Sequence, residues 1–261
     1  MKNLFLLTCF VLLMTSCSVK TYYQIVDVKS TNLQKESNNY VYNDGVCKIV
    51  YNFWSNGGNA GFLIENLSDD VIYVDLGNTF YIVNGIAKDY SSNCKLVTEL
   101  KSGIVSVEKT AVAIPPHASK IFSEYTISKD VIQDCSVKLL AKKNQPEGKV
   151  FTESESPVSF RNYITYRKDN EETAKVVSND FYVAGITNYQ SSDIVKKARA
   201  GCKKTLPATI NKKYSPGSFY IKYVETHSTA YSADAIGTSS RKVSRVGSTE
   251  FSDMYLNVRN K

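Results

Sequence analysis

Short apolar stretches that alternate with polar residues recur along most of the chain, separated by turn-forming residues. In the range 46–53 every second residue from Cys47 to Phe53 is apolar, which places these side chains on one face of a strand. The Asn84-Gly85 dipeptide favours a type I′ hairpin turn, because both residues tolerate positive φ. The pattern predicts strands at 22–28, 46–53, 61–65, 71–76, 80–83, 86–90, 105–114, 120–127, 137–141, 158–166, 175–177, 181–186 and 218–224.

Many short strands with turn signals between them predict a mainly β fold, an antiparallel β-sandwich that is immunoglobulin-like in architecture. Residues 31–39 are polar and are expected to form a loop. Pro115 and Pro116 cannot donate ladder hydrogen bonds, so they should separate the strands on either side. The residues 55–59 predict a turn by composition.

One short helix is predicted near 191–200. Ser191 or Ser192 can cap its start, and Asp193 suits the positive end of its dipole. Gly201 should end it. The sequence therefore predicts a single helix within a β protein.

The domain organisation follows from these elements and from shifts in composition. Residues 1–16 are assigned to a signal peptide, 17–45 to a lipidated N-terminus with the first strand, and 46–224 to the sandwich. The charged segment 142–157, which contains Pro and Gly, is compatible with a division into two lobes or with a long hairpin loop. Residues 225–261 lack apolar density and predict a flexible, disordered tail, in which 254–258 is a candidate pairing strand.

The N-terminus has the features of a lipoprotein signal peptide. The apolar run from Leu4 to Met14 is shorter than the roughly 20 residues that a spanning helix needs. Thr15, Ser16 and Cys17 follow it, which is the arrangement of a lipobox. We therefore expect Cys17 to be acylated and to hold the chain on a lipid bilayer. An ordinary signal peptide with a coincidental cysteine is the alternative.

Four cysteines remain in the expected mature chain besides the anchor: Cys47, Cys94, Cys135 and Cys202. An even number in an oxidising compartment permits two disulfides, with three connectivities. Buried free thiols are the alternative, and Cys47 suits it because it lies in an apolar strand pattern. The wide spacings match neither a CxxC redox motif nor a zinc ribbon.

Charge and catalytic motifs change the picture little. The formal charge of +7 is spread along the chain without a basic stripe, so no nucleic-acid partner is expected. The two histidines, His117 and His227, lie in no zinc-protease or serine-hydrolase motif, and the Asp69-Asp70 pair lies in a turn without an EF-hand pattern. We expect no metal, no cofactor and no catalytic residue.

A glycan-acting enzyme remains an alternative, because two carboxylates placed across a sugar need no sequence motif. The acidic candidates near strands are Glu65, Asp75, Glu99, Glu108 and Glu124. Aromatic candidates for a sugar-stacking platform are Tyr22, Tyr23, Phe53, Trp54, Phe80 and Tyr81, although ordinary core packing also accounts for them.

Several strings resemble a group of Bacteroidota outer-membrane lipoproteins. They are Cys17 with Thr21–Gln24, Tyr51–Trp54, Asn66–Asp75, Phe80–Gly85, Ile114–Pro116, Asp180–Val183 and Phe219–Tyr223. The resemblance implies an envelope location and brings no assigned activity with it.

The sequence thus favours a non-catalytic envelope lipoprotein that binds an envelope protein or glycan, or that has a structural role. A glycan- or peptidoglycan-acting enzyme and a fimbrial or adhesin-type subunit are the alternatives. Ser18 after the cysteine, with no acidic cluster behind it, favours the outer membrane and its periplasmic face.

Overall fold

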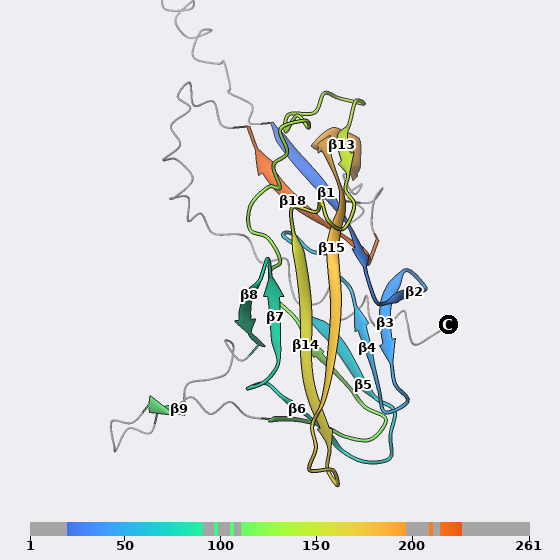
Figure 1. The fold of residues 1–261 in the computed structure, drawn as a ribbon. Coiled ribbons are helices and arrows are strands. Elements are labelled where there is room, and N and C mark those ends of the chain that lie inside the picture. Colours follow the sequence, from blue (N-terminus) through green and yellow to red (C-terminus); the bar gives the residue numbers. More distant parts are fainter. Residues whose placement is uncertain are drawn as a thin grey trace, which may run out of the picture.

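Two antiparallel sheets account for most of the described chain (Figure 1). The computed structural model describes residues 20–90, 97–98, 105–106, 111–196, 209–210 and 215–225. The nine-stranded sheet contains β1 (Thr21–Ser30), β6 (Ile72–Asp75), β7 (Phe80–Val83), β8 (Ile86–Asp89), β11 (Ala111–Ile114), β13 (Glu147–Val150), β14 (Ser159–Lys168), β15 (Lys175–Gln190) and β18 (Ser218–Val224).

The five-stranded sheet contains β2 (Gln34–Glu36), β3 (Asn39–Asn43), β4 (Cys47–Tyr51), β5 (Phe62–Asn66) and β12 (Ser119–Phe122). The remaining elements are β9 (Val97–Thr98) paired with β10 (Val105–Ser106), β16 (Val195–Lys196) paired with β17 (Thr209–Ile210), and the short helix α2 (Ser191–Ile194).

The longest strand, β15, organises the larger sheet. Its first half pairs with β14, and its second half lies between β1 and β13. The main order is β11-β6-β14-β15-β1-β18, and β7 pairs with β14 and β8. A register shift between Asp27 and Val28 lets β1 and β15 stay paired over nearly their whole common length.

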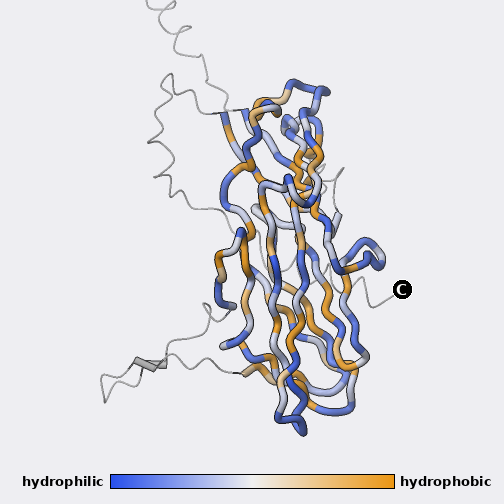
Figure 2. Tube along the Cα trace, in the orientation of Figure 1, coloured by the Kyte–Doolittle hydropathy of each residue, from blue (hydrophilic) through white to orange (hydrophobic). Residues whose placement is uncertain are grey.

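The core lies between the two sheets and is rich in aromatic rings. Cys47, Ile49, Tyr51 and Phe53 are all fully buried, which confirms the alternation predicted for this strand. The Phe53 ring packs edge-on against Phe181 at 4.9 Å between ring centroids. Figure 2 shows the same alternation of apolar and polar residues along the strands. The mainly β, antiparallel sandwich predicted from the sequence is therefore confirmed.

The predicted turns behave as expected. Asn84 and Gly85 have φ values of 48° and 80° and join β7 to β8, as a type I′ hairpin requires. Pro115 and Pro116 lie between β11 and β12 and separate the two strands. Both signals act locally, so the sequence alone is sufficient to place them.

Several predicted segments differ in the structure. Strand β12 ends at Phe122 and does not continue to residue 127, and the strands predicted at 175–177 and 181–186 are one strand, β15. The range 31–39, expected as a loop, contains β2, which pairs with β3. The range 137–141 is not a strand. Side chains of other strands donate hydrogen bonds to its carbonyl groups instead. Asn188 Nδ2 donates to the Lys138 carbonyl, and the Tyr223 hydroxyl donates to the Leu139 carbonyl.

The helix is shorter than predicted and is capped differently. It ends at Ile194, and Val195 adopts extended backbone angles and pairs with Ile210. Val195 and Ile210 are both β-branched, which favours strands, and both pack against a small cluster that contains Trp54 and Ile194. Gln190 occupies the N-cap position without a side-chain hydrogen bond, so neither serine caps the helix. Residues 197–200 lie outside the described residues.

The sandwich extends further towards the N-terminus than residue 46, because β1 and β3 belong to its two sheets. The segment 142–157 contains β13, which pairs with β15. One hydrophobic cluster includes Val137 before this segment and Phe160 after it, so the two sides share a core. Residues 226–261, expected as a tail, lie outside the described residues.

Candidate binding groove

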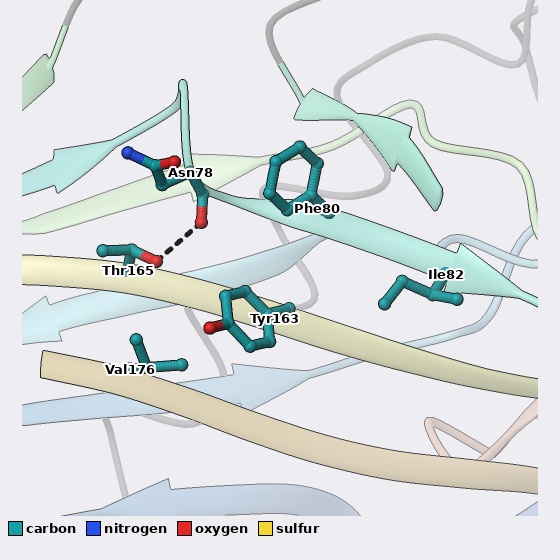
Figure 3. Close-up of a pocket in the computed structure, with 6 residues that line it drawn as sticks. All are labelled: Asn78, Phe80, Ile82, Tyr163, Thr165 and Val176. Atoms are coloured by element: carbon teal, nitrogen blue, oxygen red, sulfur yellow. Dashed lines mark hydrogen bonds between the residues drawn. The ribbon is translucent and has the colours of Figure 1, made fainter. Parts of the chain in front are cut away.

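An apolar groove lies on the outer face of the nine-stranded sheet, the face directed away from the five-stranded sheet. Strand alternation creates it: Phe160, Asn162 and Ile164 of β14 are buried between the sheets, so Tyr163 points outward. Residues paired across a ladder share a face, and Tyr163 is paired with Phe80 of β7. The groove, as the term is used below, is lined by Asn78, Phe80, Ile82, Tyr163, Thr165 and Val176 (Figure 3).

The groove is shallow and open to solvent. Its volume is about 450 Å³. The rings of Phe80 and Tyr163 are 6.4 Å apart and inclined at 41°. Val176 is 45% exposed although it is apolar. These side chains leave carbon surface open to solvent.

Two polar side chains of the groove donate hydrogen bonds within the protein. Thr165 Oγ1 donates to the carbonyl of Asn78 at 2.6 Å, and the Thr165 amide donates to Thr79 Oγ1 at 3.1 Å. Asn78 Nδ2 donates to Asp75 Oδ2 at 2.8 Å. The Thr165 hydroxyl and the Asn78 side-chain amide are therefore engaged as donors, and the groove offers mainly apolar contact beside the Tyr163 hydroxyl.

Two arginines lie beside the groove on the same face. Arg161 is paired with Ile82 across the ladder, and its side chain forms an ion pair with Asp180. Arg167 lies over the ring of Tyr73, with 4.8 Å between the guanidinium carbon and the ring centroid. An apolar centre with charged residues at its edge is the usual composition of a protein-binding surface.

The strands that form the groove are fixed from behind by Asp44, in the turn between β3 and β4. Its Oδ2 accepts hydrogen bonds from the Tyr166 hydroxyl at 2.5 Å and from Lys175 Nζ at 2.6 Å. Its Oδ1 accepts from the amides of Val46 and Cys47. Tyr166 and Lys175 directly adjoin Thr165 and Val176 in sequence, so this carboxylate ties the turn to the two groove strands.

The environment of Asp44 favours its charged form. Burial alone raises the pKa of this carboxyl group, but the hydrogen bonds from Cys47, Lys175 and Tyr166 outweigh burial and hold the pKa well below its usual range. Hydrogen bonds with a structural role therefore account for the lowered pKa of Asp44. This residue ties the five-stranded sheet to the nine-stranded sheet.

The two described cysteines differ in their exposure to solvent. Cys47 is a buried free thiol, and burial together with the nearby Asp44 carboxylate raises its pKa to about 12. Cys135 is free and exposed. Cys94, Cys202 and the expected lipidation site Cys17 lie outside the described residues.

Only one of the six aromatic candidates lines the groove, namely Phe80. Phe53 is in the main core, and Trp54 is 9% exposed in a smaller cluster. Tyr22 stacks on Tyr223 at 5.6 Å, Tyr23 packs against Tyr220, and Tyr81 packs against Tyr90. Sequence reasoning missed Tyr163, although the alternation of its strand was a usable signal.

The acidic candidates are spread over the molecule. Asp75 accepts hydrogen bonds from Gly77 and Asn78 in a turn, and Glu65 lies on β5 of the other sheet. Glu124 is exposed, with a φ of 75°. Glu99 and Glu108 lie outside the described residues.

His117 forms an exposed pair with Asp69 at 3.0 Å. His227 lies outside the described residues. Within the described ranges, no group of three His, Cys, Asp or Glu side chains is placed to hold a metal ion.

No protein-family model, curated protein or solved structure matches this chain. None of the helices in the described part of the chain is long and apolar enough to span a membrane.

Proposed function

We propose that this protein is a lipid-anchored envelope protein whose sandwich is a non-catalytic binding module for another envelope protein. The observation that carries the proposal is the outward-facing groove, with Phe80, Tyr163 and Val176 partly open to solvent. Large apolar side chains that gather on an outer sheet face mark interaction sites more often than isolated ones do.

The chemistry of the groove favours a protein segment over a sugar. A sugar needs hydrogen-bonding partners around its hydroxyl groups, whereas the Thr165 hydroxyl and the Asn78 amide already donate within the protein. Apolar side chains of a partner protein need only the exposed carbon surface. The ion pair of Arg161 with Asp180 supplies a charged edge for orientation.

Strand donation into the β18 edge is disfavoured, which weighs against a fimbrial type of assembly there. The Tyr220 amide donates to Ser55, and the Gly57 amide donates to the Tyr220 carbonyl at 2.7 Å. The Lys222 amide also donates a hydrogen bond, to Asn56 Oδ1. The loop from Ser55 to Gly57 thus occupies hydrogen-bonding groups that a donated strand would need.

Site-specific photo-crosslinking tests the binding role. A photoreactive amino acid at Val176, in cells that make the native lipoprotein, should yield one discrete adduct with another envelope protein. The matched control carries the same amino acid at Lys120, an exposed position on β12 of the other sheet. Adding Ile82→Asp should remove the Val176 adduct, because covering a charged carboxylate with apolar side chains carries a large desolvation cost. An adduct within the chain itself, or equal adducts from both positions, would contradict the proposal.

The membrane anchor has its own test. Replacing Cys17→Ala should abolish acylation and leave an unprocessed or soluble product, since the thiol is the only acceptor in the lipobox. Mass spectrometry of the N-terminal peptide measures this directly. A wild-type peptide without a lipid would refute the anchor and would leave the groove to be tested by crosslinking.

A further inference from the structure

One end of the sandwich gathers the start of β1 and the ends of β15 and β18. Thr21 is paired with Val224, and Tyr22 is paired with Gln190. The hairpin between β14 and β15, at residues 169–174, lies at the opposite end (Figure 1). The long axis of the molecule therefore separates the N-terminal end of the domain from this hairpin.

The segment 138–143 belongs to the same end as Thr21. The Tyr223 hydroxyl of β18 donates to the Leu139 carbonyl. Asn188 Nδ2 of β15 donates to the Lys138 carbonyl at 2.9 Å. These two hydrogen bonds fix the segment beside the ends of both strands.

Cations and exposed apolar side chains gather on this end. Leu140 and Val224 are each 47% exposed. The exposed residues that define this surface, called the anchor end below, are Lys20, Lys138, Leu140, Lys142, Lys143 and Val224.

Two carboxylates near the anchor end accept hydrogen bonds from neutral donors. Glu225 accepts a hydrogen bond from the Tyr22 hydroxyl, and Asp193 accepts one from the Asn144 amide. Glu147, paired with Asn188, is a third acidic residue at this end, so the four lysines leave the anchor end a small excess of positive charge.

The length of the connecting chain brings this end to the membrane. If Cys17 is acylated, as proposed above, three residues lie between it and Thr21, which makes four steps along the chain. A fully extended chain spans at most about 3.6 Å per residue, so Thr21 lies within about 14 Å of the acylated cysteine. With the acylated cysteine in the bilayer, Thr21 must therefore lie within about 14 Å of the lipid surface.

We infer that the anchor end rests on the lipid surface, with its lysines on anionic headgroups and with Leu140 and Val224 in the interfacial region. Lysines beside a membrane are attracted by anionic lipids, and exposed apolar side chains enter the headgroup boundary. This inference rests on the proposed lipid anchor. It also gives the groove a position: β15 rises about 3.3 Å per residue, so Val176 lies roughly 45 Å from Gln190 along the strand. The sandwich acts as a spacer that holds the groove away from the bilayer.

Lysine labelling of the acylated protein tests this orientation. The native lipoprotein is labelled with an amine-reactive reagent in vesicles of phosphatidylethanolamine and phosphatidylglycerol, and again in detergent. Labelling of Lys138, Lys142 and Lys143 should fall at least about fivefold in vesicles, because headgroups cover them. Lys120 and Lys168, towards the opposite end, should be labelled equally in both. Equal labelling of all five lysines in vesicles and detergent would overturn the inference.

A second measurement separates this surface from the anchor. The chain from Ser18 onward, which lacks the acylated cysteine, contains every described strand. It should sediment with phosphatidylglycerol vesicles, and Lys142→Gln with Lys143→Gln should weaken its partitioning roughly 30-fold, since each lysine contributes about fivefold. The control pair Lys120→Gln and Lys168→Gln removes the same charge from the other end and should change partitioning by less than about threefold.

The outcomes distinguish the two proposals. Loss of vesicle binding in the Lys142 and Lys143 variant, with an unacylated native protein, would support the surface and refute the anchor. Equal partitioning of both variant pairs would overturn the surface whether or not Cys17 carries a lipid.

Discussion

The outer face of the nine-stranded sheet is covered by its own chain at one end and open at the other. At the covered end, Ile25 of β1 lies beneath Trp54 and Ile194, and Trp54 packs against Tyr220 at 5.3 Å. At the open end, the groove is formed by outward residues of β7, β14 and β15. The register shift at Asp27 and Val28 lies between the two regions in β1.

This comparison separates two reasons for placing an apolar residue on an outer sheet face. Outward apolar residues at the covered end are buried by the Trp54 loop and by α2, so folding itself accounts for them. Tyr163 and Val176 gain much less burial from folding, because they stay partly exposed. Stability and binding should therefore depend on different ends of the same face.

The largest effect is expected at the covered end. Replacing Trp54→Ala should lower the free energy of unfolding by about 3 kcal/mol, since it removes a large ring that is 9% exposed and uncovers Ile25. Urea unfolding followed by circular dichroism measures the change. A loss below about 1 kcal/mol would mean that the cover adds little to folding.

A smaller loss of stability is expected behind the groove. Replacing Asp44→Asn removes the charge that accepts hydrogen bonds from Tyr166 and Lys175, which should cost about 2 kcal/mol. Asp69→Asn is the matched control, because the Asp69 side chain is 98% exposed, and it should change unfolding by less than about 0.5 kcal/mol. Equal effects of the two variants would refute the role of Asp44 as a tie.

The same tie predicts a pH dependence. The pKa of Asp44 is lowered in the folded state. Its contribution is therefore complete above the unfolded pKa of about 3.9 and is lost as pH falls through the folded pKa. The stability difference between wild type and Asp44→Asn should be constant near pH 7 and should shrink below about pH 4. A difference that grew on acidification would contradict the assigned direction.

The smallest effect on stability is expected in the groove. Replacing Tyr163→Ala should cost about 1 kcal/mol or less, because the ring is half-buried and loses mainly its cross-strand contact with Phe80. The same variant should lose the crosslink from Val176. A cost as large as that of Trp54→Ala would remove the distinction between the two ends.

Features that depend on neighbouring residues could be predicted from the sequence. The Asn84-Gly85 turn and the buried face of β4 follow from φ preferences and from alternation. Residues 137–141 look like a strand but have their carbonyls bonded by Asn188 and Tyr223, which are distant in sequence. No local pattern contains that information.

The candidate site was predictable only in part, for the same reason. Phe80 lines the groove, but Trp54 and Phe53 are aromatic residues of the same kind and are buried. Whether each of these rings is buried or exposed depends on which segments of the folded chain cover it. Tyr163 could have been placed outward from its strand pattern, but its pairing with Phe80 requires the sheet register.

Hydroxyl-radical footprinting of Phe80, Tyr163 and Trp54 tests most directly whether the open end is a binding surface. The side chains would be oxidised in the purified lipoprotein and in isolated envelopes, and the rates compared by mass spectrometry. We predict that Phe80 and Tyr163 react readily in the purified protein and are protected in envelopes, while Trp54 reacts slowly in both. Unchanged rates for Phe80 and Tyr163 in the envelope would contradict the binding role.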